Sequence, residues 1–233
     1  MASPVTKIPN SLLAALPRKS YLHLLPGLAP VDLVFGDVLY EPGEPMREVY
    51  FPGQCLVSLL TLVEGHLALE VGLVGREGMV GFPLALGVGV SPVRALVQGA
   101  GPAMKMSAAR FRTELRASSP LQDGLHRYIH AMMGQISQTA ACNRFHQVEA
   151  RLARWLLMTR DRMASDQFRM THEFLGHMLG IRRVGVTEAA SALQRRKLIE
   201  YSRGDITILD DRGLERAACS CYKETPLKMR HRS

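Results

Sequence analysis

The chain has 233 residues, of which 47% are apolar, enough for one large domain or two smaller ones, each with its own core. No apolar run reaches the length of about 18 residues that a membrane span needs. The first residues, MASPVTKIPN, lack the basic segment and apolar core of a secretory signal. These exclusions favour a soluble, cytoplasmic protein with no membrane partner.

The formal net charge of +8 is concentrated in the C-terminal part. Residues 1–143 carry 11 Lys/Arg and 10 Asp/Glu, whereas residues 144–233 carry 18 and 11. Such an excess predicts an anionic partner for the C-terminal part, and nucleic acid is the first candidate. A well-solvated basic surface would have the same composition.

The four cysteines, Cys55, Cys142, Cys219 and Cys221, include no C-x-x-C pair. Their spacing is typical neither of a zinc finger nor of a disulfide framework, so we expect reduced thiols. An iron–sulfur sensor is the alternative, but it usually needs a denser set of ligands. Because Cys219 and Cys221 alone do not complete a metal site, neither a metal nor a cofactor is predicted.

The N-terminal half has the pattern of an all-β domain. Residues 10–25 have helical apolar spacing, but from about residue 31 short apolar runs alternate with Gly and Pro. This pattern predicts many short antiparallel strands, as in a β-sandwich, barrel or jelly roll, with a last strand at 93–97. The expected turns are Gly36-Asp37, Pro42-Gly43, Pro52-Gly53 and Glu64-Gly65.

A short helix is predicted over 111–116, and Ser118-Ser119-Pro120 is a start signal for a longer one. Apolar residues then recur at alternating steps of three and four, which predicts a coiled-coil seam and a homodimer. The residues assigned to this seam are Leu121, Leu125, Tyr128, Met132, Ile136 and Thr139. A helix packed on its own β-domain would have a similar pattern, and the broad apolar surface allows both.

A second helix is predicted over 148–160, with Trp155 as a core anchor, and residues 161–169 read as a connector. The stretch THEFLGHMLGIRRVGVTEAASALQRRKLIEY then predicts two short helices. Thr171 can cap the first, and Gly180 can end it in the left-handed conformation. The predicted inner face of the second helix consists of Val186, Ala189, Ala190 and Leu193. Two helices joined in this way match a helix-turn-helix.

In a helix-turn-helix the second helix enters the major groove of DNA. Arg182 and Arg183 are unfavourable at a helix N-terminus unless they meet negative charge, which phosphates or guanine edges would supply. Gly185 keeps the first turn slim, while Thr187 and Glu188 point outward. A glutamate here can accept a hydrogen bond from a cytosine amino group.

The segment 198–209 alternates around an Arg-Gly turn and predicts a β-hairpin, or wing, with Arg203 at its tip for a phosphate contact. A helix-turn-helix, a wing and local positive charge together favour DNA binding. Each of these features alone would be weak.

These segments resemble the Crp/Fnr family of bacterial transcription regulators over most of the chain. The resemblance is carried by the β-rich half, the long helix at 120–143 and the stretches THEFLGHMLGIRRVGVTE, YSRGDITILD and LERAACSCY. It implies an α+β fold, with an N-terminal cyclic-nucleotide-binding-like β-roll (jelly roll), a dimerisation helix and a C-terminal winged helix-turn-helix. The corresponding boundaries are 1–117, 118–145 and 146–223, followed by a disordered basic tail at 224–233.

The resemblance also implies a homodimer that binds a palindromic promoter site in double-stranded DNA, with RNA polymerase as a further candidate partner. The expected DNA contacts are Thr171, His172, Arg182, Arg183, Gly185, Thr187, Glu188 and Arg203.

The effector pocket departs from the family pattern. Relatives that bind cyclic AMP carry a glutamate after the glycine of the phosphate loop and later an Arg-Ser or Arg-Thr pair. Here Phe82 follows Gly81, and Ala95 follows Arg94. We therefore expect a degenerate pocket at Gly81, Phe82 and Arg94 that takes another ligand or none, rather than cyclic AMP.

A zinc site and an enzyme are both disfavoured by the sequence. His172 and His177 in HEFLGH are five residues apart, about 140° around a helix, so they cannot chelate zinc from one face. With no catalytic constellation at a recognisable spacing, an enzyme is not expected. The alternative function is a sensory or interaction protein whose winged helix binds a protein partner.

Overall fold

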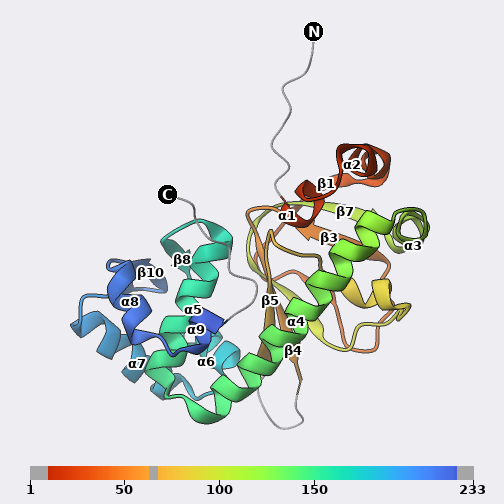
Figure 1. Cartoon of the computed structure of the whole chain (residues 1–233). Coiled ribbons are helices and arrows are strands. Elements are labelled where there is room, and N and C mark those ends of the chain that lie inside the picture. The colour runs from red at the N-terminus through yellow and green to blue at the C-terminus, as the bar shows by residue number, and fades with distance from the viewer. Residues whose placement is uncertain (1–9, 63–67, 225–233) are drawn as a thin grey trace.

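The computed structural model describes residues 10–62 and 68–224. In this part of the chain an N-terminal β-domain is followed by the long helix α4 (Ser119–Phe145) and a C-terminal part of helices with a small sheet (Figure 1). The predicted α+β class is confirmed. The turn expected at Glu64-Gly65 and all of the expected tail except Glu224 lie outside the described residues.

The β-domain contains two antiparallel sheets, with strand orders β1-β7-β3 and β2-β6-β4-β5. Their strands are β1 (Ala29–Leu33), β2 (Val38–Tyr40), β3 (Glu48–Pro52), β4 (Leu56–Thr61), β5 (Leu69–Val74), β6 (Arg94–Gly99) and β7 (Gly101–Ser107). The last predicted strand is β6, but β7 follows it and pairs with both β1 and β3. Gly101 makes this turn at φ 154°, so close to the Gln54 carbonyl that a Cβ would overlap it.

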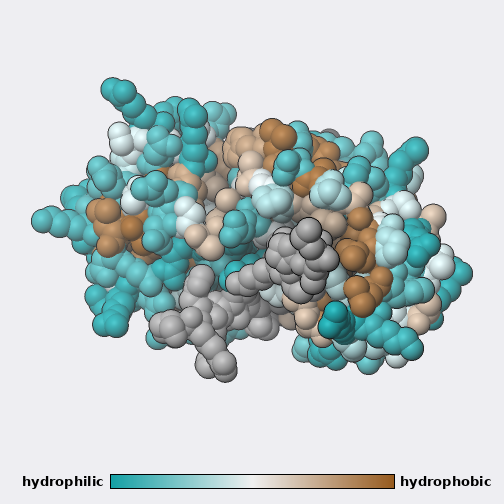
Figure 2. Space-filling model, turned by 90° about the horizontal axis from the view of Figure 1, so that it is seen from above, coloured by the Kyte–Doolittle hydropathy of each residue, from teal (hydrophilic) through white to brown (hydrophobic). Residues whose placement is uncertain are grey.

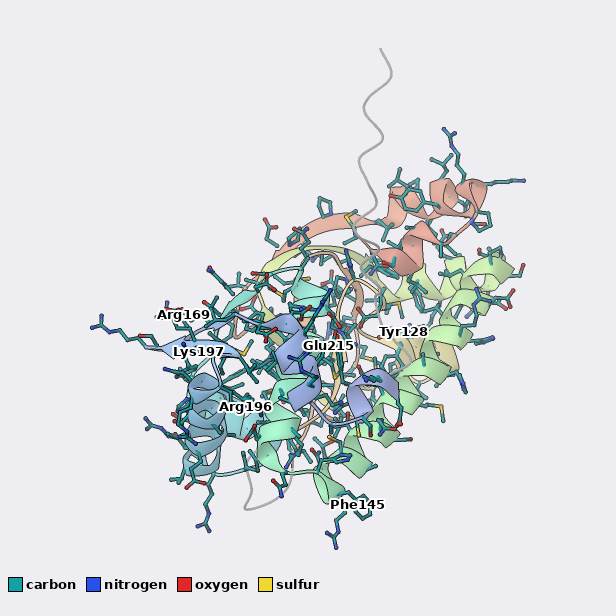
Figure 3. All side chains as sticks on the ribbon, turned by 60° about the vertical axis from the view of Figure 1, so that its left-hand side comes forward. Tyr128, Phe145, Arg169, Arg196, Lys197 and Glu215 are labelled. Atoms are coloured by element: carbon teal, nitrogen blue, oxygen red, sulfur yellow. The ribbon has the colours of Figure 1, made fainter. Side chains whose placement is uncertain are left out.

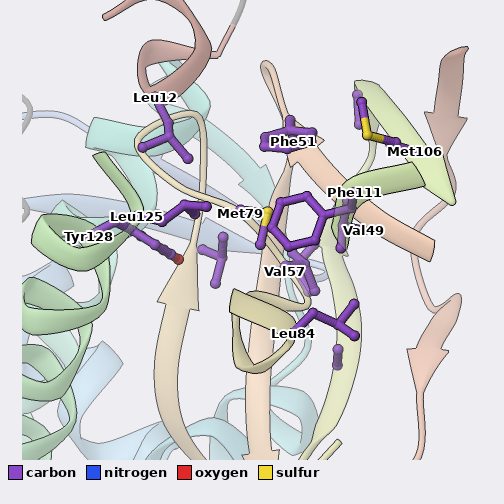
Figure 4. Packing of buried hydrophobic residues seen from close by; sticks show 14 of the residues in the cluster. Leu12, Val49, Phe51, Val57, Met79, Leu84, Met106, Phe111, Leu125 and Tyr128 are labelled. Carbon is purple, nitrogen blue, oxygen red and sulfur yellow. The ribbon is translucent and has the colours of Figure 1, made fainter. Parts of the chain in front are cut away.

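Short helices close the β-domain around its core (Figure 4). They are α1 (Ser11–Ala14), α2 (Arg18–Leu24), the 3₁₀ turns η1 (Leu25–Gly27) and η2 (Phe82–Leu86), and α3 (Ala108–Ala117). Phe51 and Phe111 are among the largest fully buried side chains of this core. Asn10 is fully buried, where it caps α1 and donates hydrogen bonds to Pro52 O (2.9 Å) and Gly78 O (2.8 Å).

Helix α4 begins as the sequence predicts, with Ser118 as its N-cap and Pro120 in its first turn. It packs on its own β-domain: Leu121, Leu125, Tyr128 and Met132 are buried in the core, and Ile136 packs against it. Thr139 Oγ1 accepts a hydrogen bond from Arg154 of the C-terminal part (3.4 Å). The assignment of the four buried residues to a dimer seam is therefore corrected, because the chain's own packing covers them. Ile136 and Thr139 are half-buried, and their assignment stays a prediction.

The C-terminal part is built around α5 (Val148–Met163), which packs against the other helices of this part, and a small sheet completes it. The remaining elements are β8 (Gln167–Arg169), α6 (His172–Leu179), α7 (Arg183–Arg195), β9 (Ile199–Ser202), β10 (Asp205–Ile208), α8 (Asp211–Ala217) and α9 (Cys221–Glu224). The predicted connector at 161–169 is wrong in part, since α5 extends to Met163 and β8 pairs with β10 as a third strand. Three residues are too few to show a periodic pattern.

Buried polar contacts join the C-terminal part to the β-domain. Arg162 Nε lies 2.7 Å from Glu77 Oε1, and Arg162 Nη2 donates to Gln135 Oε1 of α4 (2.9 Å). Trp155, the predicted core anchor, is buried and donates from Nε1 to Glu70 Oε1 (2.9 Å). Since these groups are shielded from water, their pairing fixes how the parts sit together.

No helix among residues 10–62 and 68–224 has both the length and the apolar character that crossing a membrane requires.

Candidate nucleic-acid interface

The first helix of the helix-turn-helix is α6. Thr171 is its N-cap and accepts a hydrogen bond from Phe174 N (3.1 Å), as the sequence predicts. Gly180 ends the helix at φ 63°, in the left-handed conformation expected of it. The turn then packs so tightly on α6 that a Cβ at Gly176 would lie 2.9 Å from Ile181 O. Gly176 is thus a requirement of the turn that sequence analysis missed.

The second helix, α7, begins at Arg183, with Arg182 as an N-cap whose side chain makes no capping hydrogen bond. Both arginine side chains are exposed. The predicted inner face, Val186, Ala189, Ala190 and Leu193, is buried against the C-terminal core. Thr187 and Glu188 are exposed and Gly185 is half-buried, so the outer face of α7 begins with these residues and the two arginines.

The wing is the hairpin of β9 and β10, with Arg203 and Gly204 as its two-residue turn. Both have positive φ, 51° and 93°, as a type I′ turn requires. A left-handed conformation is unusual for arginine and exposes its side chain at the tip. The predicted hairpin is therefore confirmed.

A surface hollow of about 510 Å³ brings several of the predicted contacts together. It is lined by Thr171, His172, Glu173, Arg183, Tyr201, Arg203 and Gly204, from α6, α7 and the wing. Its lining residues do not include Arg182, the N-cap of α7, or Gly185, Thr187 and Glu188, which lie further along this helix. Figure 3 shows further cations, Arg169, Arg196 and Lys197, on the side of the C-terminal part away from α4.

His172 connects all three elements around this hollow. Its Nδ1 lies 2.9 Å from Thr187 Oγ1, and its ring stacks on Tyr201 at 4.3 Å between centroids. Thr187 Oγ1 also lies 3.0 Å from Arg183 O, so this hydroxyl bridges the His172 ring and the backbone of the first turn of α7. Burial, and next the charge of Arg183, lower the pKa of His172, which keeps the ring neutral.

Tyr201 lines this hollow, as do Glu173 and Gly204, and none of the three was among the predicted DNA contacts. The Tyr201 hydroxyl donates to Met170 O (3.0 Å), which ties the wing to the entrance of α6. Its place in the strand pattern of the wing was the only available signal, and that pattern does not distinguish a stacking partner from an ordinary strand residue.

The three residues of the expected effector pocket have partners within the chain. The Phe82 ring packs edge-on against Tyr128 of α4, with 6.0 Å between centroids. Arg94 Nε lies 2.9 Å from Glu41 Oε2. Gly81 has φ 92°, and a Cβ there would lie 2.7 Å from the Tyr40 hydroxyl. Phe82 is thus part of the packing between η2 and α4.

A separate apolar cavity of about 610 Å³ lies between the β-domain and the C-terminal part. Phe35 and Gln98 contribute to its wall from one side, and Met163, Phe168 and Phe174 from the other. Because the lining includes Thr171 and Phe174 of α6, a ligand in this cavity would touch the first helix of the helix-turn-helix.

The structure corrects the prediction made for the cysteines. The expectation that Cys219 and Cys221 lack further ligands is wrong, because Cys142 and His146 lie beside them. One ligand atom from each of the four residues falls within 4.8 Å of the others. The end of α4 contributes two of these residues, and the segment from Cys219 to Cys221 contributes the other two, a proximity that spacing alone does not predict.

With this geometry established, residues 150–217 match the family model described as the Crp-like helix-turn-helix domain. No curated protein matches the chain.

Several solved structures are similar over most of their length. FixK2 from Bradyrhizobium japonicum is 14% identical, with a TM-score of 0.69 over 82% of this chain and 98% of its own. The c-di-GMP responsive global regulator CLP of Xanthomonas campestris is 16% identical, with a TM-score of 0.67 over 83% and 100%. A CRP/FNR family transcriptional regulator from Thermus thermophilus is 22% identical, with a TM-score of 0.66 over 82% and 98%.

The chain therefore has the fold of the Crp/Fnr transcription regulators. Within it, residues 150–217 match the Crp-like helix-turn-helix domain. The resemblance inferred from the sequence is confirmed.

Proposed function

We propose that this chain is a sequence-specific DNA-binding transcription regulator and not an enzyme. The observation that carries the proposal is the surface on which Arg183 and Arg203 meet around one hollow, next to the exposed outer face of α7. A helix of 13 residues is about 20 Å long and fits the major groove, while the wing reaches the neighbouring backbone.

The roles of the predicted contacts follow from their positions. Arg183, Thr187 and Glu188 start the outer face of α7 and are proposed to meet base edges, and Gly185 lets the DNA approach closely. Arg182 and Arg203 are proposed to bind phosphates. Thr171 caps α6, and His172 links α6 to α7 through Thr187. With its lowered pKa, His172 supports the surface rather than supplying charge.

We propose that two copies meet along the outward face of α4, in place of the buried residues first assigned to the seam. This exposed stripe continues at alternating steps of four and three: His126, His130, Met133, Ser137, Ala140 and Arg144. Met133 is 63% exposed, and small residues follow it, which would let two helices approach closely. A two-fold dimer would present two copies of α7 to a palindromic site.

The β-domain is proposed to lack cyclic AMP binding. The ribose-binding glutamate is replaced by Phe82, which packs on Tyr128, and Arg94 is paired with Glu41. Calorimetry with cyclic AMP should show no heat of binding, and a micromolar affinity would overturn this part of the proposal.

The main experiment measures the affinity of the full chain for promoter fragments, including one upstream of its own gene, over a range of salt concentrations. If phosphates are neutralised by Arg182, Arg203 and their neighbours, affinity should fall steeply as salt rises, because bound counterions are released. No fragment bound above the nonspecific level, or a flat salt dependence, would contradict DNA binding and favour a protein-binding winged helix.

A further inference from the structure

Three thiols and one imidazole converge where α4 ends and the described C-terminal segment packs against it. Cys142 lies in the last turn of α4, and His146 is its C-cap. Cys221 begins α9, and Cys219 lies two residues before it. All three cysteines are buried and His146 is half-buried, so the four side chains form a compact cluster largely shielded from water.

The distances within this cluster match those between the ligands of one small metal ion. Cys142 Sγ and Cys219 Sγ are 3.5 Å apart, and Cys221 Sγ lies 3.4 Å from His146 Nδ1. A tetrahedral zinc ion with Zn–S bonds of about 2.3 Å holds its sulfur ligands about 3.8 Å from each other. Since every pair of ligand atoms lies within 4.8 Å, small side-chain movements would complete such a site. An iron–sulfur cluster would instead hold its cysteines further apart.

We propose that Cys142, His146, Cys219 and Cys221 form a structural zinc site of the Cys₃His type. With four protein ligands the site is closed, with no position left for water or substrate, which is typical of structural rather than catalytic zinc. The metal displaces the thiol protons, so three thiolates and a neutral imidazole around Zn²⁺ carry a net charge of −1.

The surroundings of the cluster suit this charge. Arg151 and Arg154 of α5 are buried, and both line the same small cavity as Cys142. The Nε atoms of both arginines are buried without a hydrogen-bond partner in the described part of the chain. Gln138 Nε2 donates to Cys221 Sγ (2.8 Å), as an outer-shell group does when it orients a thiolate ligand.

The position of the site indicates what the metal would do. His146 and Gln147 separate α4 from α5, and this break sets the direction in which the C-terminal part leaves the long helix. A metal bound here ties α9 and the preceding turn to that break. Zinc would thus hold the DNA-binding part in a fixed orientation on α4.

The test uses the full chain, purified under reducing conditions from zinc-supplemented cells, and measures bound metal by elemental analysis. We expect about one zinc per chain. Replacement by Co²⁺ should give the visible absorption of a tetrahedral ion together with thiolate-to-metal charge transfer. These readouts do not involve DNA, so they remain valid whether or not the proposed function holds.

Two variants and a matched control locate the metal. Cys219→Ser and Cys221→Ser should each lose it, whereas Cys55→Ser should keep it, because Cys55 lies in the β-domain with its thiol directed at Pro102 O (3.4 Å). Gln138→Ala should retain the site but bind zinc about 10- to 100-fold more weakly in competition with a chelator.

A measurement on the unaltered chain guards against variants that fail to fold. Stepwise modification of thiols by a mercurial should release zinc as the clustered cysteines react. Reduced protein that takes up neither Zn²⁺ nor Co²⁺ would overturn the proposal. Full metal content in a folded Cys219→Ser variant, or zinc that stays bound after all thiols have reacted, would do so as well.

Discussion

The hollow between α6, α7 and the wing is lined by two exposed arginines, one exposed carboxylate (Glu173) and a stacked pair of rings. Arg183 and Arg203 bring exposed charge, whereas His172 and Tyr201 stack on each other and hold the three elements together. The arginines alone would move independently, because one belongs to a helix and the other to a hairpin. Their relative position depends on uncharged neighbours. The arginines thus supply the positive charge of this surface, whereas His172 and Tyr201 fix the geometry that sequence-specific binding needs.

Arg183 and Arg203 should respond differently to truncation. Arg183→Ala is expected to cost about 1–3 kcal/mol on the preferred site and to blur sequence preference at one position, because a base contact is lost. Arg203→Ala should weaken all duplexes alike and reduce the salt dependence, because a phosphate contact is lost. Fluorescence anisotropy on the preferred site and its single-base-pair variants measures both. An unchanged sequence preference in Arg183→Ala would show that Arg183 does not contact a base.

Substitution of Gly185 should affect the stability of the protein and its affinity for DNA in opposite directions. A Cβ at this position would meet Ile181 Cδ1 at 3.6 Å, an ordinary contact, so the free protein has room for alanine. Gly185→Ala should therefore raise the free energy of unfolding by about 1 kcal/mol through helix propensity. If DNA approaches this turn, the same variant should lose DNA affinity. Urea unfolding and anisotropy test the two effects, and a more stable variant with undiminished affinity would contradict close approach.

The contact between β5 and α5 depends on a buried carboxyl group. Glu70 accepts hydrogen bonds from Ser58 Oγ (2.7 Å) and Trp155 Nε1 (2.9 Å), so one side chain joins the β-domain to the C-terminal part. Burial raises the pKa of Glu70 to about 7, against the opposing effects of these hydrogen bonds and of the charges on Arg162 and Arg154. The free-energy cost of burying the Glu70 carboxyl group therefore depends on pH.

Glu70 should make stability fall as pH rises. In the unfolded chain its carboxyl group titrates near 4.5, so between about pH 4.5 and 7 the folded state binds more protons. Its contribution is fully present below that window and is lost above it, with a size on the order of 3 kcal/mol. Glu70→Gln should remove this slope and be the more stable protein at pH 8.

Urea unfolding of Glu70→Gln and the wild-type chain from pH 5 to 8 measures the difference between their slopes. Glu200→Gln, at an exposed position of β9, is the control and should follow the wild-type curve. Parallel curves for Glu70→Gln and the wild type would show that the buried carboxyl group does not titrate in this range.

Local patterns predicted the elements that depend on neighbouring residues. Ser118 and Thr171 cap the helices expected of them, and the Arg203-Gly204 turn closes the expected hairpin. These features succeed because caps and tight turns are decided within a few residues. Strand β8 was missed because its three residues are defined by pairing with β10 rather than by their own alternation.

Contacts between distant segments could not be predicted in this way. The apolar stripe on α4 is compatible with a partner chain or with the β-domain, because its spacing shows only that something covers it. The structure shows that the chain's own β-domain covers the stripe from Leu121 to Ile136. The proximity of Cys142 and Cys219 could not be predicted for the same reason, because only the fold brings together residues that are 77 positions apart.

At the level of the whole molecule, the β-domain touches the helix-turn-helix directly at α6. The rings of Phe35 and Phe174 are 5.7 Å apart, and Gly180 lies so close to Leu69 of β5 that a Cβ would meet its side chain at 2.6 Å. Together with the Arg162–Glu77 ion pair, these contacts hold the two parts in one arrangement. The space-filling view in Figure 2 shows a largely hydrophilic surface over the C-terminal part, at left, as its excess of cations requires.

Adjacent methionines of α4 provide a test of the dimer. Met132 is 1% exposed and packs on the β-domain, whereas Met133 is 63% exposed on the outward stripe. Met133→Glu places two like charges opposite each other across a two-fold seam, so it should convert a dimer into a folded monomer. Met132→Glu should instead destabilise the chain itself, because it buries a charge in the core.

Sedimentation of the chain without DNA should show a dimer at micromolar concentration for the wild type and a monomer for Met133→Glu. Leu22→Glu, at another exposed apolar position on α2, is the control and should remain a dimer. Because a palindrome is bound by two linked copies of α7, Met133→Glu should lose most of its affinity for the full site but little for a half-site. A wild-type monomer, or a dimeric Met133→Glu, would place the seam elsewhere and remove the symmetry argument for a palindromic site.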